Sequence, residues 1–359
     1  MTQARQLVST FRRAPEGRRL APPKAFANGV VAVRQRFVRD EITAQGHYRY
    51  YQWTEPLPSD RKILLQVVAA TDSETTGFDT VDLQRSVIPP RPDARLFVLA
   101  CGVNDYFGDG QIQQLDFAVN NATTIATTFE RSTRGLYSTK AMSLLDRNAT
   151  PSFWHHVTRS YADQLKDKVS PDDVLVIFLS GHGWRDEETS KYYFVTGGAR
   201  SADVRAGRYS DCMSFEDIAA FSDVPCRKLV ILDTCHSGAI GESRESARRY
   251  KDLKTALRAL QEDVVLTMTA SQGEEDAVEE KERGLGRFTS HLIAAISGQA
   301  DNLHGGNQDG TVSLQEAIRY VKATVADDSA QSEFKQHPTA GPAELLRYVD
   351  FPLTQPRAR

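Results

Sequence analysis

The chain has 359 residues, of which 40% are hydrophobic and 25% are charged, and its formal net charge is -3. This balance gives no sign of a nucleic-acid partner, no apolar run reaches transmembrane length, and the first residues lack the apolar core of a secretory signal. Its four cysteines contain no C-x-x-C pair, which argues against a disulfide framework and suits a reducing, cytoplasmic compartment.

The composition changes along the chain and predicts five parts. Residues 1–28 carry six Arg and Lys against one Glu, which predicts a flexible basic arm. Residues 29–88 contain β-rich runs separated by turn clusters, which predicts a small β module, either immunoglobulin-like or a partial sandwich. Residues 89–94 form a Pro-rich linker. An α/β domain over 95–350 and a short tail over 351–359 complete the expected organisation.

From residue 95 onward, predicted strands alternate with predicted helices. The strands are expected at 96–102, 140–145, 174–180, 192–196, 229–232 and 264–270. The helices are expected at 116–131, 152–168, 214–222, 250–262, 288–297 and 314–326. Ser214 with Asp217, and Ser313 with Glu316, have the spacing of helix N-caps. The alternation predicts a mainly parallel sheet with helices on both faces, in which ligands bind at the carboxyl ends of the strands.

Two of these strands end in residues that carry chemistry. One runs into His182, which lies between two glycines, and another runs into Cys235. A free thiol titrates near 8.5, so a nucleophilic cysteine needs a base, and His182 is the candidate. The backbone N–H groups of Gly183 and Cys235 are the expected oxyanion hole. The histidine lies 53 positions before the cysteine (235 − 182), close to the spacing of a caspase-type dyad.

Both strand ends match known motifs. Ser180-Gly-His-Gly183 and Asp233-Thr-Cys-His-Ser-Gly238 resemble the two signature motifs of metacaspases and of bacterial caspase-like peptidases, the orthocaspases. Other segments are similar to the first strand, the first helix and a later helix of that domain, namely Leu96–Asn104, Leu115–Ala122 and Arg287–Leu292. The resemblance implies a cysteine endopeptidase that hydrolyses protein or peptide substrates through a thioester acyl-enzyme. The β module resembles the small β domains that precede such peptidases in bacteria.

The resemblance also implies a specificity pocket. Asp233 matches the acidic S1 residue that gives metacaspases their preference for Arg or Lys at P1, where animal caspases carry a glutamine. A carboxylate suits this task because it accepts charge-assisted hydrogen bonds from guanidinium or ammonium groups. Metacaspases have a second acidic S1 residue at the end of their helix motif, and here that position is Asn121. Nearby Asp116 is a candidate replacement.

Two further features have competing interpretations. His236 is a rival base, although adjacent residues on a strand diverge, which favours a supporting role. The segment after the cysteine is rich in Arg and Lys and includes Arg244, Arg248 and Arg249. It is either an exposed loop and helix or a linker that the peptidase cleaves in itself.

No cofactor or metal ligand is predicted. A zinc site from Cys212, Cys226, Cys235 and His236 lacks ligand spacing, and Asp309-Gly310 with Glu316 matches only part of a calcium loop. The resemblance leaves calcium activation open without requiring it. A caspase-fold peptidase with a non-basic P1 preference and a pseudo-peptidase scaffold are the alternative functions, and an upstream activator or regulator protein is a candidate partner. Neither a nucleic acid nor a membrane is expected as a partner.

Overall fold

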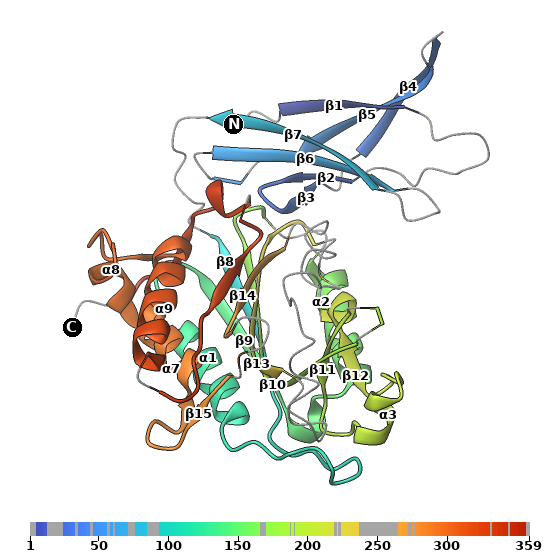
Figure 1. Ribbon diagram of the computed structural model, residues 1–359. Helices are drawn as coiled ribbons and strands as arrows, with labels where there is room; N and C mark the ends of the chain where they lie inside the picture. The colour runs from blue at the N-terminus through green and yellow to red at the C-terminus, as the bar shows by residue number, and fades with distance from the viewer. Residues whose placement is uncertain are drawn as a thin grey trace.

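The protein is an α/β protein built around one mainly parallel sheet, with a smaller all-β part near its N-terminus (Figure 1). The computed structural model describes residues 5–12, 24–32, 35–43, 46–55, 58–59, 62–70, 76–84, 93–165, 170–186, 188–189, 191–218, 221, 224–236, 265–271, 275, 277–330, 332–343 and 345–356. The fold class predicted from the sequence is confirmed.

The central sheet of the described chain has eight strands. They are β8 (Arg95–Gly102), β9 (Ser138–Leu145), β10 (Val174–Arg185), β11 (Tyr192–Val195), β12 (Cys212–Ser214), β13 (Arg227–His236), β14 (Leu266–Thr269) and β18 (Thr339–Gly341). Strands β9, β8, β10, β13 and β14 run parallel, and β18, β11 and β12 pair antiparallel at the margins. The middle strands are apolar runs buried along their length, as expected of strands covered on both faces.

Helices cover both faces of this sheet, as predicted. Figure 1 shows α1 (Ala118–Ser132), α7 (Arg287–Ala294) and α9 (Leu314–Ser329) on one side, and α2 (Pro151–Leu165) and α3 (Ser201–Arg205) on the other. Two hydrophobic clusters correspond to these faces, one containing Ile125 of α1 and the other Trp154 of α2. Within the described part of the chain, none of the helices has the length and apolar character needed to span a bilayer.

Both predicted helix caps are confirmed. Helix α4 (Phe215–Ile218) begins after Ser214, whose Oγ accepts the N–H of Asp217 at 3.1 Å, while the Ser214 N–H donates to the Asp217 carboxylate at 2.8 Å. Helix α9 begins with a complete capping box formed by Ser313 and Glu316. The helix expected over 250–262 lies outside the described residues.

The remaining elements of the α/β part are short. They are η1 (Asp146–Asn148), β15 (Glu279–Glu280), β16 (Leu285–Gly286), the π-helical turn η3 (Ala295–Gln299), α8 (Ala300–Asn302), β17 (Val312–Ser313), η4 (Leu345–Arg347) and β19 (Pro352–Thr354). Strand β19 pairs with β17, and Phe351 and Leu353 are buried. The expectation of a C-terminal tail over 351–359 is therefore wrong up to Thr354, because these apolar side chains complete the core under α9.

The described residues of the N-terminal β part form two small sheets. Strands β1 (Arg5–Arg12), β5 (Gly46–Glu55) and β4 (Gln35–Thr43) form one, and β3 (Val30–Ala32), β2 (Lys24–Ala27), β6 (Lys62–Ala70) and β7 (Thr76–Gln84) form the other. The expectation of a flexible arm over 1–28 is wrong for β1 and β2. Strand β1 pairs with β5 along its whole length, and β2 lies between β3 and β6. Charge content alone could not reveal these backbone pairings.

The β part packs against the amino ends of the central strands, as Figure 1 shows. Asp172, just before β10, accepts the backbone N–H of Ser59 at 2.8 Å and forms an ion pair with Arg227 at 3.2 Å. The Arg227 guanidinium lies 4.9 Å from the centroid of the Phe351 ring. Both side chains of the ion pair are buried, so this junction joins the two parts through a desolvated polar contact. Most of the predicted linker over 89–94 lies outside the described residues.

Replacing Asp172 with Asn is expected to lower the free energy of unfolding by about 3 kcal/mol, because it removes the carboxylate that pairs with the buried Arg227 guanidinium. Chemical denaturation measures the change. Asp203→Asn is the matched control, since Asp203 pairs with Arg208 at an exposed site where ion pairs contribute about 1 kcal/mol or less. Equal effects of the two substitutions would contradict the proposed importance of the junction.

Candidate active site

The two sequence motifs meet at the carboxyl ends of β10 and β13. These strands pair in parallel, and their register places His182 opposite Cys235 and Ser180 opposite Asp233. On its other side, β10 pairs with β8 as far as Ser180 and with β11 from Gly183 onward. The backbone therefore brings together the two strand ends on which the sequence analysis placed the chemistry.

His182 is held by two residues of the loop between β8 and α1. Its Nε2 lies 2.8 Å from the carbonyl oxygen of Gln113, and its backbone N–H donates to the Tyr106 hydroxyl at 2.8 Å. The centroids of the Tyr106 and His182 rings lie 4.8 Å apart. A carbonyl oxygen only accepts, so the proton of a neutral imidazole is on Nε2 and Nδ1 carries the free lone pair. Burial lowers the pKa of His182 and so favours the neutral form, whereas the hydrogen bond to the Gln113 carbonyl raises the pKa by a smaller amount.

The loop that carries Gln113 is itself fixed by amide side chains. The Gln114 side chain accepts the Tyr106 N–H at 2.7 Å and donates to the Tyr106 carbonyl at 2.9 Å. The Asn104 side chain donates to the Asp116 carbonyl at 3.1 Å and accepts the N–H of Val119 at 3.0 Å. These contacts tie the loop to itself and to α1. Sequence reasoning missed this support because irregular loops leave no periodic signal.

Gly183 is required by close packing. A methyl group built onto it would lie 2.9 Å from the Tyr192 ring and 3.2 Å from Thr234 Oγ1. Tyr192 and Thr234 are themselves joined by a buried hydrogen bond of 3.1 Å. A larger residue would separate β10 from β11 and β13 just where His182 must stay in place. The assignment of the Gly183 and Cys235 N–H groups to an oxyanion hole stays a prediction.

Asp233, the first residue of the cysteine motif, lies in a buried polar cluster. Its Oδ2 accepts hydrogen bonds from Asn121 Nδ2 at 3.3 Å and from the Thr289 hydroxyl. Asn121 also donates to Ser180 Oγ at 3.0 Å and accepts the N–H of Gly286 at 2.9 Å. The structure thus brings together Asp233 and Asn121. Thr289 and Gly286 were not predicted from the sequence, because they belong to neither of the motifs that indicated this pocket.

The Asp233 carboxyl is near its ionisation point at neutral pH. Burial raises its pKa to about 7, the Thr289 hydrogen bond lowers it, and the negative charge of Glu279 raises it. The Asp116 carboxylate does not join this cluster. Asp116 is exposed, and its backbone N–H donates to Glu279. The sequence placed Asp116 near the pocket, but the chain turns at this point and points the residue outward.

The remaining predicted site residues are the proposed cleavage arginines and His236. Arg244, Arg248 and Arg249 lie outside the described residues. His236 follows Cys235 at the end of β13, opposite Gly183 in the register.

Three cysteines away from the site are free and buried, namely Cys101, Cys212 and Cys226. Burial is the main cause that raises the pKa of each of these thiols. Such thiols are poor nucleophiles. Among the described residues, no group of three His, Cys, Asp or Glu is arranged to hold a metal ion.

Residues 95–349 match the family model of the caspase domain. The chain belongs to the caspase domain family. This membership makes it a cysteine peptidase of the caspase clan, and hence a hydrolase. The matched region contains β8 to η4, with both motifs, whereas the β strands before residue 85 lie outside it. No curated protein shows significant similarity to the chain.

Proposed function

We propose that the protein is a cysteine endopeptidase in which Cys235 is the nucleophile and His182 the general base. One observation carries the proposal: the register of β10 and β13 sets the two residues opposite each other at the carboxyl ends of their strands. In open α/β sheets this end is where ligands bind. The contact of His182 Nε2 with Gln113 supports the assignment, because it leaves Nδ1 to accept a proton.

The reaction follows from these roles. His182 Nδ1 takes the thiol proton, and the thiolate of Cys235 attacks the scissile carbonyl carbon. The N–H groups of Cys235 and Gly183 bind the oxyanion that forms. The C–N bond then breaks, and the amine leaves with the proton from His182, so that a thioester remains on Cys235. His182 next takes a proton from water, whose oxygen attacks the thioester, and the peptide acid leaves as the thiol is restored.

We further propose that the S1 pocket selects Arg or Lys. The proposal is supported by the Asp233 carboxylate, which accepts a hydrogen bond from Asn121, and by Ser180, which accepts another from the same amide. An ionised carboxylate held in a buried site binds a guanidinium more strongly than an exposed one does. A non-basic P1 preference is the competing candidate, favoured by the amide at Asn121. The resemblance of the two motifs supports a metacaspase-like or orthocaspase-like peptidase, and the free buried cysteines suit the cytoplasm.

A panel of fluorogenic peptides tests the proposal. Substrates with Arg, Lys, Asp or Leu at P1, with and without calcium, are compared between the wild type and Cys235→Ala. We expect cleavage after Arg and Lys by the wild type only. Activation by self-cleavage predicts that the wild type is clipped within 241–258 while Cys235→Ala stays intact unless wild type or an upstream activator is added. No Cys235-dependent cleavage of any substrate, by the clipped form included, would indicate a pseudo-peptidase.

A further inference from the structure

The short hairpin of β15 and β16 closes one side of the Asp233 cluster. The two strands are antiparallel, with Glu279 opposite Gly286. The backbone at Gly286 is so close to the cluster that a methyl group there would lie 3.0 Å from Asp233 Oδ2 and 3.1 Å from Asn121 Nδ2. Because paired strands lie about 4.8 Å apart, Glu279 is one strand away from the proposed S1 pocket.

The Glu279 carboxylate reaches back from this hairpin to the start of α1. Its two oxygens accept the backbone N–H groups of Asp116 at 3.0 Å and Phe117 at 2.8 Å. The N-cap residue, Phe117, makes no side-chain hydrogen bond to the N–H groups at this helix end, and the first turn of α1 has no acidic residue. Glu279 therefore supplies the anion that a helix N-terminus favours. Asn121 lies on the next turn of the same helix, so the carboxylate is fixed beside the position where a second S1 acid would be expected.

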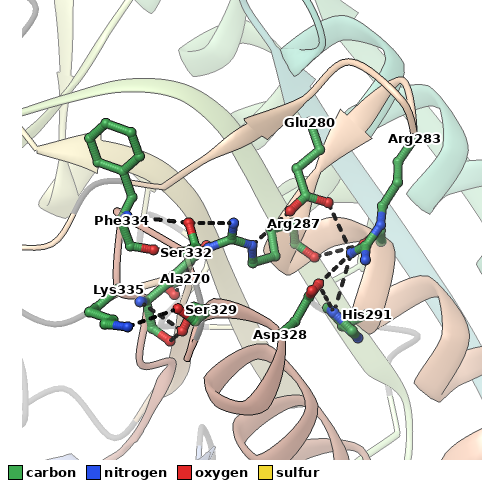
Figure 2. Close-up of polar contacts among 12 residues, drawn as sticks. Ala270, Glu280, Arg283, Arg287, His291, Asp328, Ser329, Ser332, Phe334 and Lys335 are labelled. Atoms are coloured by element: carbon green, nitrogen blue, oxygen red, sulfur yellow. Dashed lines mark hydrogen bonds and ion pairs between the residues drawn. The ribbon is translucent and has the colours of Figure 1, made fainter.

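The adjacent residue anchors the hairpin on its other side. Glu280 accepts a hydrogen bond from Arg287 Nε at 2.7 Å and forms an ion pair with Arg283 at 2.9 Å (Figure 2). The buried Arg287 also donates to the Phe334 carbonyl at 3.0 Å and to Ser332 Oγ at 3.2 Å. Successive strand residues face opposite sides. Glu280 thus fastens the hairpin to the loop after α9, while Glu279 faces α1.

Asp233 supplies one carboxyl group to this cluster. Both of its hydrogen bonds to described residues reach Oδ2. Its own charge is only half present near neutral pH, and Asn121 adds none. Glu279 lies opposite Gly286 in the hairpin, the backbone of Gly286 lies against Asp233, and the charge of Glu279 raises the pKa of the Asp233 carboxyl.

We propose that Glu279 is the second acidic residue of the S1 pocket and supplies the negative charge that the neutral amide of Asn121 does not. The pocket then recognises a guanidinium or ammonium group through Asp233 and Glu279 together. This inference rests on the proposed function, because it assigns the Asp233 cluster to S1. It adds a residue from outside the two motifs, on a hairpin fixed by the Arg287 contacts.

Binding of two peptides that differ only in charge tests the inference. Peptides ending in Arg or in citrulline, its neutral isostere, are titrated into Cys235→Ala, so that the result does not depend on catalysis. We expect Glu279→Gln to weaken the Arg peptide about tenfold, which is about 1.4 kcal/mol, and to leave the citrulline peptide unchanged. Glu279→Asp keeps the charge and should retain most of the preference for Arg.

The controls separate charge recognition from helix capping. Glu282→Gln removes an exposed charge from the same hairpin and should leave the Arg-to-citrulline ratio unchanged. Loss of the helix cap would weaken both peptides equally. An unchanged ratio in Glu279→Gln, or no preference for Arg in the parent protein, would overturn the inference. If the preference exists and depends on Glu279 while the wild type cleaves nothing, the inference stands and the proposed chemistry fails.

Discussion

Replacing His182 with Ala is expected to reduce kcat for peptide hydrolysis by about a thousandfold or more, because the thiol of Cys235 loses the base that removes its proton. The geometry supports this size of effect. His182 is buried, its ring is fixed by Gln113 and Tyr106, and its Nδ1 is the nitrogen left to accept the proton. Steady-state kinetics on the best peptide of the P1 panel measures the loss.

His236→Ala is the matched control for this experiment, since His236 is the rival base next to the nucleophile in sequence. We expect kcat to stay within about threefold of the wild type, as a supporting loop residue predicts. If His236→Ala lost the activity and His182→Ala kept it, the assignment of the base would be wrong. Thermal unfolding of both variants verifies that each one is folded.

The second large expected effect is a pH dependence of the preference for Arg, which comes from the titration of Asp233. The Asp233 carboxyl has a pKa of about 7, so it is mostly protonated at pH 6 and mostly ionised at pH 8. A P1 arginine stays cationic throughout this range. The ratio of kcat/KM for Arg over citrulline substrates is therefore expected to rise about tenfold from pH 6 to pH 8. Asp233→Asn should remove this rise and lower the ratio at pH 8 by about a hundredfold.

The ratio of kcat/KM values separates the titration of Asp233 from that of His182. The pKa of His182 is lowered from its ordinary value, so its protonation reduces activity only toward acidic pH. It affects both substrates alike and cancels in the ratio, which reports the free enzyme through kcat/KM. A ratio that is flat with pH in the wild type would contradict a cation-binding role for Asp233.

The sequence was sufficient for the parts of the site that lie on the central strands. Buried apolar runs predicted β10 and β13, and parallel strands place their carboxyl ends at one edge of the sheet, so His182 and Cys235 were expected at that edge. Their position opposite each other comes from the register of the two strands. Asn121 was also expected near Asp233 from its helix motif. In each case the position depends on a regular element, whose geometry follows from its residue pattern.

The parts that the sequence did not predict depend on irregular segments and on pairing between distant strands. Tyr106 and Gln113 lie in a loop whose shape is set by side-chain amides, and Glu279 lies on a two-residue strand too short for a period-two pattern. Strand β1 forms because β5 offers it a backbone partner, in spite of its arginines. Long-range contacts of this kind leave little trace in local composition.

The most direct test of Cys235 as the nucleophile is covalent labelling with a peptidyl-Arg chloromethyl ketone, followed by peptide mapping with mass spectrometry. Displacement of chloride by the thiolate would leave one adduct, on Cys235, and both Cys235→Ala and an excess of Arg substrate should prevent it. The buried thiols of Cys101, Cys212 and Cys226 should stay unmodified. An adduct on another residue, or an active enzyme that takes no label on Cys235, would contradict the proposed mechanism.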